Sequence, residues 1–190
     1  MSSKSSRTAM TRSKPSLPIR TLVKRGYLVK EASVFDYGHG KGRDMIWLRE
    51  QGYTVDGWDP YHEPPEGFLG EGFAHVYQSG IIYDWVCLGY VLNVIDDPGY
   101  RIDILKDIYR DMSFGAKISV AVRTFEEVER SSTDKWIPHS DGWLTSIDTF
   151  QTGFFPHQLE NMLVEAGFDN VQFVKSDPLI AIARKNVDVY

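Results

Sequence analysis

The sequence contains a single cysteine, Cys87, among 190 residues. One cysteine excludes an internal disulfide and leaves no cysteine cluster for zinc, so we expect a reducing, cytoplasmic setting. No uninterrupted apolar run approaches the ~18 residues that a membrane-spanning helix needs. The five histidines show no metal-ligand spacing. These absences predict a protein without a membrane span, a metal or a disulfide framework.

Acidic residues are absent from the first thirty positions, which carry eight lysines and arginines. The remaining residues must therefore hold a net charge of −13 to give the overall −5. We expect residues 1–18 to form a flexible basic arm, followed by one domain over residues 19–190. Such an arm either contacts DNA or another nucleic acid or is a solvated surface, and the sequence leaves both readings open.

Three glycines alternate with other residues where an apolar strand is expected to end, in Asp36-Tyr37-Gly38-His39-Gly40-Lys41-Gly42. Glycine has no Cβ and tolerates positive φ, so this turn between strand and helix lets a ligand approach the backbone closely. A second acid, Asp59, comes seventeen residues after Gly42, at the end of the next expected strand. Asp36 is placed to accept from a cofactor's ammonium, and Asp59 from both ribose hydroxyls. The pattern predicts a nucleoside cofactor lying across two strand ends.

The spacing of the glycines separates this loop from two other nucleotide sites. A dinucleotide site needs G-x-G-x-x-G, but Arg43 occupies the slot of the third glycine. A phosphate loop needs Gly-Lys-Ser/Thr, which does not follow. The pattern D-x-G-x-G-x-G instead resembles motif I of the class I methyltransferases, which implies S-adenosylmethionine as cofactor and a Rossmann-like fold.

Alternating strand and helix patterns predict an α/β fold with a doubly wound, seven-stranded, mostly parallel sheet. The turn Ser176-Asp177-Pro178 lies between the last two strands, which we expect to form an antiparallel C-terminal hairpin at the sheet edge. Residues 123–149 form a long polar stretch, expected to be a loop that acts as lid and acceptor pocket. The expected strands are 33–36, 54–58, 73–77, 84–90, 117–122, 171–174 and 179–183, and the expected helices are 19–24, 43–51, 98–112 and 156–166.

The superfamily resemblance also implies where the cofactor and the methyl acceptor would lie. Gln78, after the third strand, would read adenine, and the end of the fourth strand would line the methyl-transfer mouth. Candidates for catalysis are Tyr90, Asn93 and His139, although Asn93 could equally cap the turn that leaves the fourth strand. Candidates for cofactor binding are Asp36, Gly38, His39, Gly40, Gly42, Asp59, Pro60, Tyr61, Gln78, Leu88 and Gly89.

Several pieces of the sequence together resemble the DNA phosphorothioation-associated methyltransferases, over residues 7 to 155. These pieces are Arg7-Thr8-Ala9, Arg12-Ser13-Lys14-Pro15-Ser16, Phe35-Asp36-Tyr37-Gly38, Gly57-Trp58-Asp59-Pro60-Tyr61, Leu88-Gly89-Tyr90-Val91-Leu92-Asn93-Val94-Ile95 and Thr149-Phe150-Gln151. The resemblance implies a DNA-modification context without naming the acceptor.

The sequence therefore predicts an S-adenosylmethionine-dependent methyltransferase, in a DNA-modification context if the closer resemblance holds. A non-catalytic module that binds the cofactor and is attached to nucleic acid is one alternative. An NAD(P)-dependent oxidoreductase is another. The methyl acceptor and the oligomeric state are left open.

Overall fold

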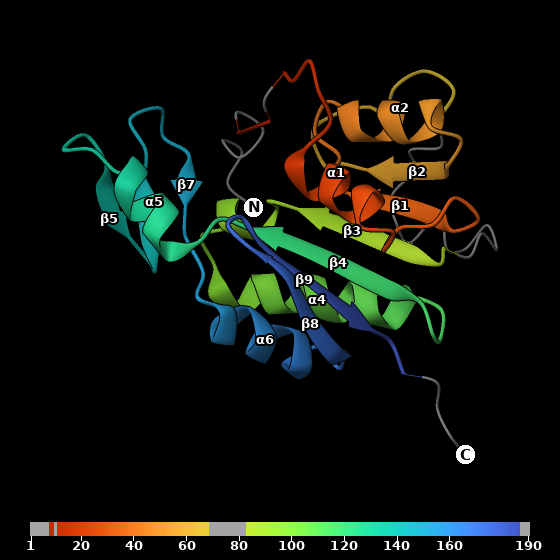
Figure 1. Cartoon of the computed structure of the whole chain (residues 1–190). Helices are drawn as coiled ribbons and strands as arrows, with labels where there is room; N and C mark the ends of the chain where they lie inside the picture. The colour runs from red at the N-terminus through yellow and green to blue at the C-terminus, as the bar shows by residue number, and fades with distance from the viewer. Residues whose placement is uncertain (1–7, 10, 69–82, 187–190) are drawn as a thin grey trace.

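A six-stranded sheet forms the centre of the molecule in a computed structural model, which describes residues 8, 9, 11–68 and 83–186 (Figure 1). The strand order is β2-β1-β3-β4-β9-β8. The first four strands are parallel, β9 is antiparallel to β4, and β8 is antiparallel to β9. The strands are β1 (Ser33–Tyr37), β2 (Thr54–Trp58), β3 (Trp85–Gly89), β4 (Lys117–Val122), β8 (Asp169–Ser176) and β9 (Leu179–Arg184).

The mostly parallel α/β sheet with its antiparallel C-terminal pair is confirmed, and six of the seven expected strands lie within the described residues. The described chain pairs six strands in this sheet. The seventh expected strand, at residues 73–77, lies outside the described residues. Central strands are buried along their length, as in Trp85–Leu88 of β3, because helices cover both faces of the sheet.

Helices α1 (Leu17–Lys24) and α2 (Arg43–Glu50) cover one face of the sheet, and α4 (Pro98–Asp111) and α6 (Pro156–Glu165) cover the other (Figure 1). Each helix buries one apolar side, and the two faces have separate apolar clusters. The first cluster includes Ile19, Leu22, Met45 and Leu48, and the second includes Ile104, Leu105, Ile108, Leu159 and Leu163. Helix α1 begins two residues earlier than expected, because Ser16 caps it and Pro18 fits its first turn.

Residues 123–151, called the insert below, are folded, so the prediction of a long loop is wrong. They contain helix α5 (Phe125–Ser131) and a separate antiparallel sheet of β5 (Ile137–His139), β6 (Gly142–Leu144) and β7 (Phe150–Gln151). These strands have two or three residues each, too short for a period-2 pattern to show in the sequence. The insert stands beyond the carboxyl ends of β3 and β4 (Figure 1).

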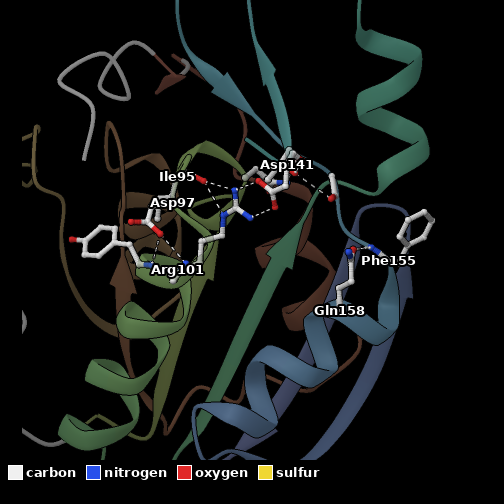
Figure 2. A network of polar contacts seen from close by, with 11 residues as sticks. Ile95, Asp97, Arg101, Asp141, Phe155 and Gln158 are labelled. Carbon is white, nitrogen blue, oxygen red and sulfur yellow. Dashed lines mark hydrogen bonds and ion pairs between the residues drawn. The ribbon is translucent and has the colours of Figure 1, made fainter. Parts of the chain in front are cut away.

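A buried arginine fastens the insert to the main domain (Figure 2). Arg101 of α4 is 2% exposed and donates through Nη1 and Nη2 to the two carboxylate oxygens of Asp141, at 2.5 and 2.8 Å. Its Nε and Nη2 also donate to the carbonyl of Ile95, at 2.8 and 2.6 Å. All three nitrogens of the guanidinium thus have a partner, which is the condition for burying a charge at acceptable cost.

No helix within the described ranges is long and apolar enough to cross a membrane.

Candidate functional site

A cavity of about 1090 Å³ opens at the carboxyl ends of the parallel strands. Its wall is made by the glycine loop after β1, the start of the loop after β2, the end of β3, the insert, and residues 8, 9 and 11–16, called the N-terminal segment below. A crevice at the carboxyl ends of strands is the usual ligand site of open α/β sheets. The structure brings eleven of the predicted site residues to this wall: Asp36, Gly38, His39, Gly40, Asp59, Pro60, Tyr61, Leu88, Gly89, Tyr90 and Asn93.

The glycine loop has the backbone conformation that its sequence suggests. Gly38, Gly40 and Gly42 have φ of 78°, 57° and 69°, in the left-handed region that glycine adopts without strain. A Cβ at Gly38 would overlap the side chain of Val91, and one at Gly42 would overlap Pro65. Gly42 itself is not part of the cavity wall. At these two positions glycine therefore makes room for the protein's own neighbouring loops.

Asp36 lies at the end of β1 and is buried. Burial raises the pKa of Asp36 well above its usual range, and the nearby carboxylates of Asp44 and Asp59 raise it further, while Arg12 opposes them. A carboxyl group in this state gains from a cation placed beside it, because the cation stabilises the charged form. An ammonium group of a ligand is such a cation.

Asp59 follows β2 and holds the neighbouring loops together. Its Oδ2 accepts from the amide of Gly40 at 2.9 Å, across the glycine loop. Its Oδ1 accepts from the amides of Tyr61 and His62, at 2.9 and 3.1 Å, and lies 2.9 Å from Nδ1 of His62. Among the described residues, Oδ2 accepts from one donor, the Gly40 amide, so a second lone pair is available to a ligand hydroxyl.

Two buried nitrogens in the cavity wall lack a hydrogen-bond partner among the described residues: Nε2 of His39 and Nε of Arg43. His39 is 8% exposed, and its Nδ1 lies 2.9 Å from the carbonyl of Gly40. Burial lowers the pKa of His39, so the ring is neutral and Nδ1 is the donor. Buried polar atoms normally have partners. Unpaired nitrogens beside a glycine loop therefore fit a polar cofactor that completes the wall.

The N-terminal segment packs against the glycine loop and α2. The amide of Ser16 donates to Asp44 at 2.6 Å, and the Arg12 guanidinium lies 4.0 Å from the same carboxylate. Lys41 donates to the hydroxyl of Thr11 at 2.7 Å. These contacts join residues about thirty positions apart, so no local pattern in the sequence predicts them. The segment thereby encloses the cofactor end of the cavity.

Tyr90 is part of the cavity wall and directly follows β3. Its φ of 63° is unusual for a bulky residue and marks a conformation held by its surroundings. Burial raises the pKa of Tyr90 to about 12, with Glu127 adding to the rise and with Arg12 and Arg123 opposing it. The phenol therefore stays protonated at neutral pH and can donate a hydrogen bond.

The other two catalytic candidates lie differently. Asn93 is 1% exposed, and both ends of its amide are engaged: Nδ2 donates to the carbonyl of Thr152 at 2.6 Å, and Oδ1 accepts from the amide of Arg123 at 3.1 Å. His139 is not part of the cavity wall, and its Nε2 lies 3.6 Å from Asp96. The structure therefore does not bring His139 to Tyr90. Gln78 lies outside the described residues.

The insert supplies cavity residues that were not among the predicted candidates, notably Arg123, Glu127 and Gln151. Arg123 donates to Glu127 Oε1 at 2.9 Å, to Gln151 Oε1 at 3.2 Å and to the hydroxyl of Ser131 at 2.7 Å. The first five residues after β4 already contain the T-x-x-E signal of a helix start at Thr124. That signal could have revealed α5 and the position of Glu127.

Comparison with known proteins identifies the family of the chain. A family described as "Methyltransferase domain" matches residues 11–173. The chain belongs to this methyltransferase family. The match includes the glycine loop, Tyr90 and the whole insert. The cofactor expected from the sequence, S-adenosylmethionine, is the methyl donor of this family. No curated protein matches the chain in sequence.

Solved structures of other methyltransferases share the fold. The 1,6-didemethyltoxoflavin-N1-methyltransferase of Burkholderia thailandensis, with S-adenosylhomocysteine and its acceptor bound, aligns with a TM-score of 0.60 and 20% identity, over 90% of this chain and 79% of its own. Human N-acetylserotonin methyltransferase with S-adenosylmethionine aligns with a TM-score of 0.63 and 21% identity, over 90% of this chain and 52% of its own. A Pyrococcus horikoshii protein aligns with a TM-score of 0.68 and 16% identity, over 88% and 89%. At these identities the likeness concerns the fold.

Proposed function

We propose that this methyltransferase-family chain transfers a methyl group from S-adenosylmethionine to a small acceptor bound between Tyr90 and the insert. One observation carries the proposal: a single cavity joins the glycine loop to Tyr90 and to the insert. Its volume of about 1090 Å³ is at the upper end of small-molecule sites, which suits a nucleoside cofactor together with a small acceptor. The bound acceptor of the Burkholderia enzyme, 1,6-didemethyltoxoflavin, is also a small molecule.

The roles of the residues follow from their surroundings. Asp36 would hold the ammonium of S-adenosylmethionine and Asp59 its ribose, while bound cofactor supplies an electrophilic methyl group. The N-terminal segment and the insert form parts of the cavity wall, and this placement would limit the access of water to a bound acceptor. The protonated phenol of Tyr90 offers a hydrogen bond at the mouth between the two ends. Positioning and desolvation of the acceptor are then the main contributions of the protein to the rate.

Calorimetric titration with S-adenosylmethionine, S-adenosylhomocysteine and NADH tests the cofactor. We expect binding of the first two, whereas binding of NADH alone would contradict the proposal and favour an oxidoreductase. Transfer of radiolabelled methyl groups to separate metabolite, DNA, RNA and protein fractions then tests the acceptor. We expect label in the metabolite fraction. Tight cofactor binding without transfer to any fraction would favour a non-catalytic binding module.

A DNA-modification context is a second candidate, supported by the resemblance described above and by the basic N-terminus. Removing residues 1–7 takes away Lys4 and Arg7 and leaves the contacts of Arg12 and Ser16 with Asp44 in place. Electrophoretic mobility of duplex and single-stranded DNA should then be compared with the full chain and the shortened one. Retardation that disappears with residues 1–7 would support this context, and label in DNA would make DNA the acceptor.

A further inference from the structure

We propose that the carboxylate of Glu127 holds the methyl acceptor by its N–H or O–H group and takes the proton as the methyl group is transferred. The inference rests on the proposed methyltransferase function and goes beyond it by naming the acceptor-facing residue. It also names the chemical class of the acceptor, a small molecule with an N–H or O–H nucleophile.

The position of Glu127 is the first observation. Its side chain belongs to the cavity wall and is 33% exposed. Among the charged groups near Tyr90, the Glu127 carboxylate contributes most to raising the pKa of the phenol, so the two side chains lie close together. Tyr90 directly follows the carboxyl end of β3, where the methyl-transfer mouth is expected. Glu127 therefore faces this mouth from the insert.

The other carboxylates in the described cavity wall are engaged at the cofactor end. Asp36 lies near the end of β1. The Asp44 carboxylate accepts from the amide of Ser16, and the Asp59 carboxylate accepts from the amide of Gly40 in the glycine loop. Within the described residues, Glu127 is the one cavity carboxylate contributed by the insert. An acceptor between Tyr90 and the insert thus meets Glu127 before any other carboxylate.

The side chain of Glu127 does not complete the cap of α5. Thr124 caps this helix and accepts from the Glu127 amide at 3.1 Å. In a capping box, the glutamate side chain at this position reaches back to the amide of the cap residue. Among the hydrogen bonds of the described chain, the Glu127 carboxylate instead accepts from Arg123 Nε, at 2.9 Å.

Arg123 fixes the carboxylate in place. It bonds Oε1 of Glu127 while Gln151 and Ser131 hold its other two nitrogens. One N–H donor on each of the three guanidinium nitrogens is thus used, and this three-point anchoring holds Oε1 of Glu127 in place. Oε2 of Glu127 has no recorded partner among the described residues and is the atom offered to an acceptor.

The chemical step balances without a further reactant. The lone pair of the acceptor nitrogen or oxygen forms the new bond to the methyl carbon, and the sulfur–methyl bond breaks with its electron pair returning to sulfur. The acceptor's proton passes to Oε2 of Glu127, which later releases it to water. Proton transfer by a positioned carboxylate is typically worth about 10²- to 10⁴-fold in rate.

Binding of the charged and uncharged forms of the cofactor tests the position of Glu127 without any acceptor. S-adenosylmethionine carries a sulfonium charge at the methyl group, and S-adenosylhomocysteine does not. In Glu127→Gln we expect the affinity for S-adenosylmethionine, relative to that for S-adenosylhomocysteine, to fall about fivefold. The substitution removes a carboxylate that faces the sulfonium and leaves the positive charge of Arg123 without its counter-charge. Glu126→Gln is the matched control, since Glu126 precedes Glu127 in the same turn and is exposed outside the cavity wall.

The outcomes separate this inference from the proposed function. An unchanged affinity ratio in Glu127→Gln, or the same change in Glu126→Gln, would overturn the role of Glu127. Absence of binding of either cofactor form to the unaltered protein would overturn the proposed function instead. With an acceptor of the unaltered enzyme, Glu127→Gln should lower kcat about 100-fold or more, and Glu127→Asp should restore part of the rate. Unchanged kcat in Glu127→Gln would contradict the proton transfer.

Discussion

Arg101 and Asp141 lie forty positions apart and form a two-bond ion pair that joins α4 to the insert (Figure 2). The arginine is buried, whereas the side chain of the aspartate is about half exposed. The hydroxyl of Thr152 adds a bond to the Asp141 carbonyl at 2.8 Å. The position of the insert beside the cavity thus depends on the ion pair between the buried Arg101 and Asp141.

Asp141→Asn should lower the free energy of unfolding by about 1–3 kcal/mol, because Arg101 stays buried with a weakened partner. Urea unfolding followed by circular dichroism measures the change. Asp107→Asn is the matched control: it removes one carboxylate from the exposed Arg110–Asp107 pair and should cost about 0.5 kcal/mol or less. Equal effects of the two substitutions would show that burial of Arg101 has no energetic importance.

Asp44 should hold the N-terminal segment against the cavity wall. Asp44→Ala removes the acceptor of the Ser16 amide and the charge beside Arg12, so amide exchange over residues 11–16 should become at least tenfold faster. Asp44→Asn keeps an acceptor oxygen for Ser16 and should accelerate exchange less. Hydrogen exchange read by mass spectrometry compares the two. Unchanged protection in Asp44→Ala would mean that other contacts hold the segment.

Asp36 should make the protein less stable as the pH rises. An unfolded aspartate titrates at about 3.9, and burial raises the pKa of Asp36 in the folded chain. Between these two values the folded state keeps a proton that the unfolded state has lost, so the free energy of unfolding falls as the pH increases through that window. Above the pKa of Asp36 in the folded state, the free energy of unfolding falls no further. Each unit of pKa difference between the folded and unfolded states corresponds to about 1.4 kcal/mol of lost stability.

Asp36→Asn removes this loss, so its stability should exceed that of the unaltered chain by an amount that grows from about pH 4 upwards. Urea unfolding at several pH values measures the difference, and the exposed Asp103→Asn is the control. The same Asp36→Asn variant should bind S-adenosylhomocysteine more weakly, because an amide cannot neutralise its ammonium. A constant difference at all pH values would show that Asp36 is not the titrating group.

The sequence predicted the main sheet and its cofactor end well, because those features are local. The glycine loop, the end of β1 and the acid after β2 are each legible within a few neighbouring residues. Apolar runs such as Lys117–Val122 gave strand positions that the structure reproduces to the residue. The strand expected at residues 73–77 lies outside the described chain and stays a prediction.

The acceptor end was poorly predicted because long-range contacts define it. The short strands β5, β6 and β7 are stabilised by pairing with one another and by the bond from Arg101 to Asp141. Such long-range contacts leave no periodic pattern in the sequence. His139 looked suitable as a base from its residue type, but the fold turns it toward Asp96. Glu127 was not among the candidates: the T-x-x-E signal locates it at a helix start, but its place in the cavity wall near Tyr90 arises only in the folded chain.

Asp59→Ala should weaken binding of S-adenosylhomocysteine at least tenfold, because charge-assisted hydrogen bonds worth roughly 1.5–3 kcal/mol are lost. The structure gives Asp59 a second task, since it also bonds Gly40 and Tyr61 within the loops. An analogue that lacks both ribose hydroxyls separates the two tasks by calorimetry: loss of affinity for S-adenosylhomocysteine alone indicates ribose recognition, and equal loss for both ligands indicates loop support. His62→Ala, which keeps the carboxylate and removes one neighbour, should change affinity little. Unchanged binding in Asp59→Ala would refute the ribose assignment.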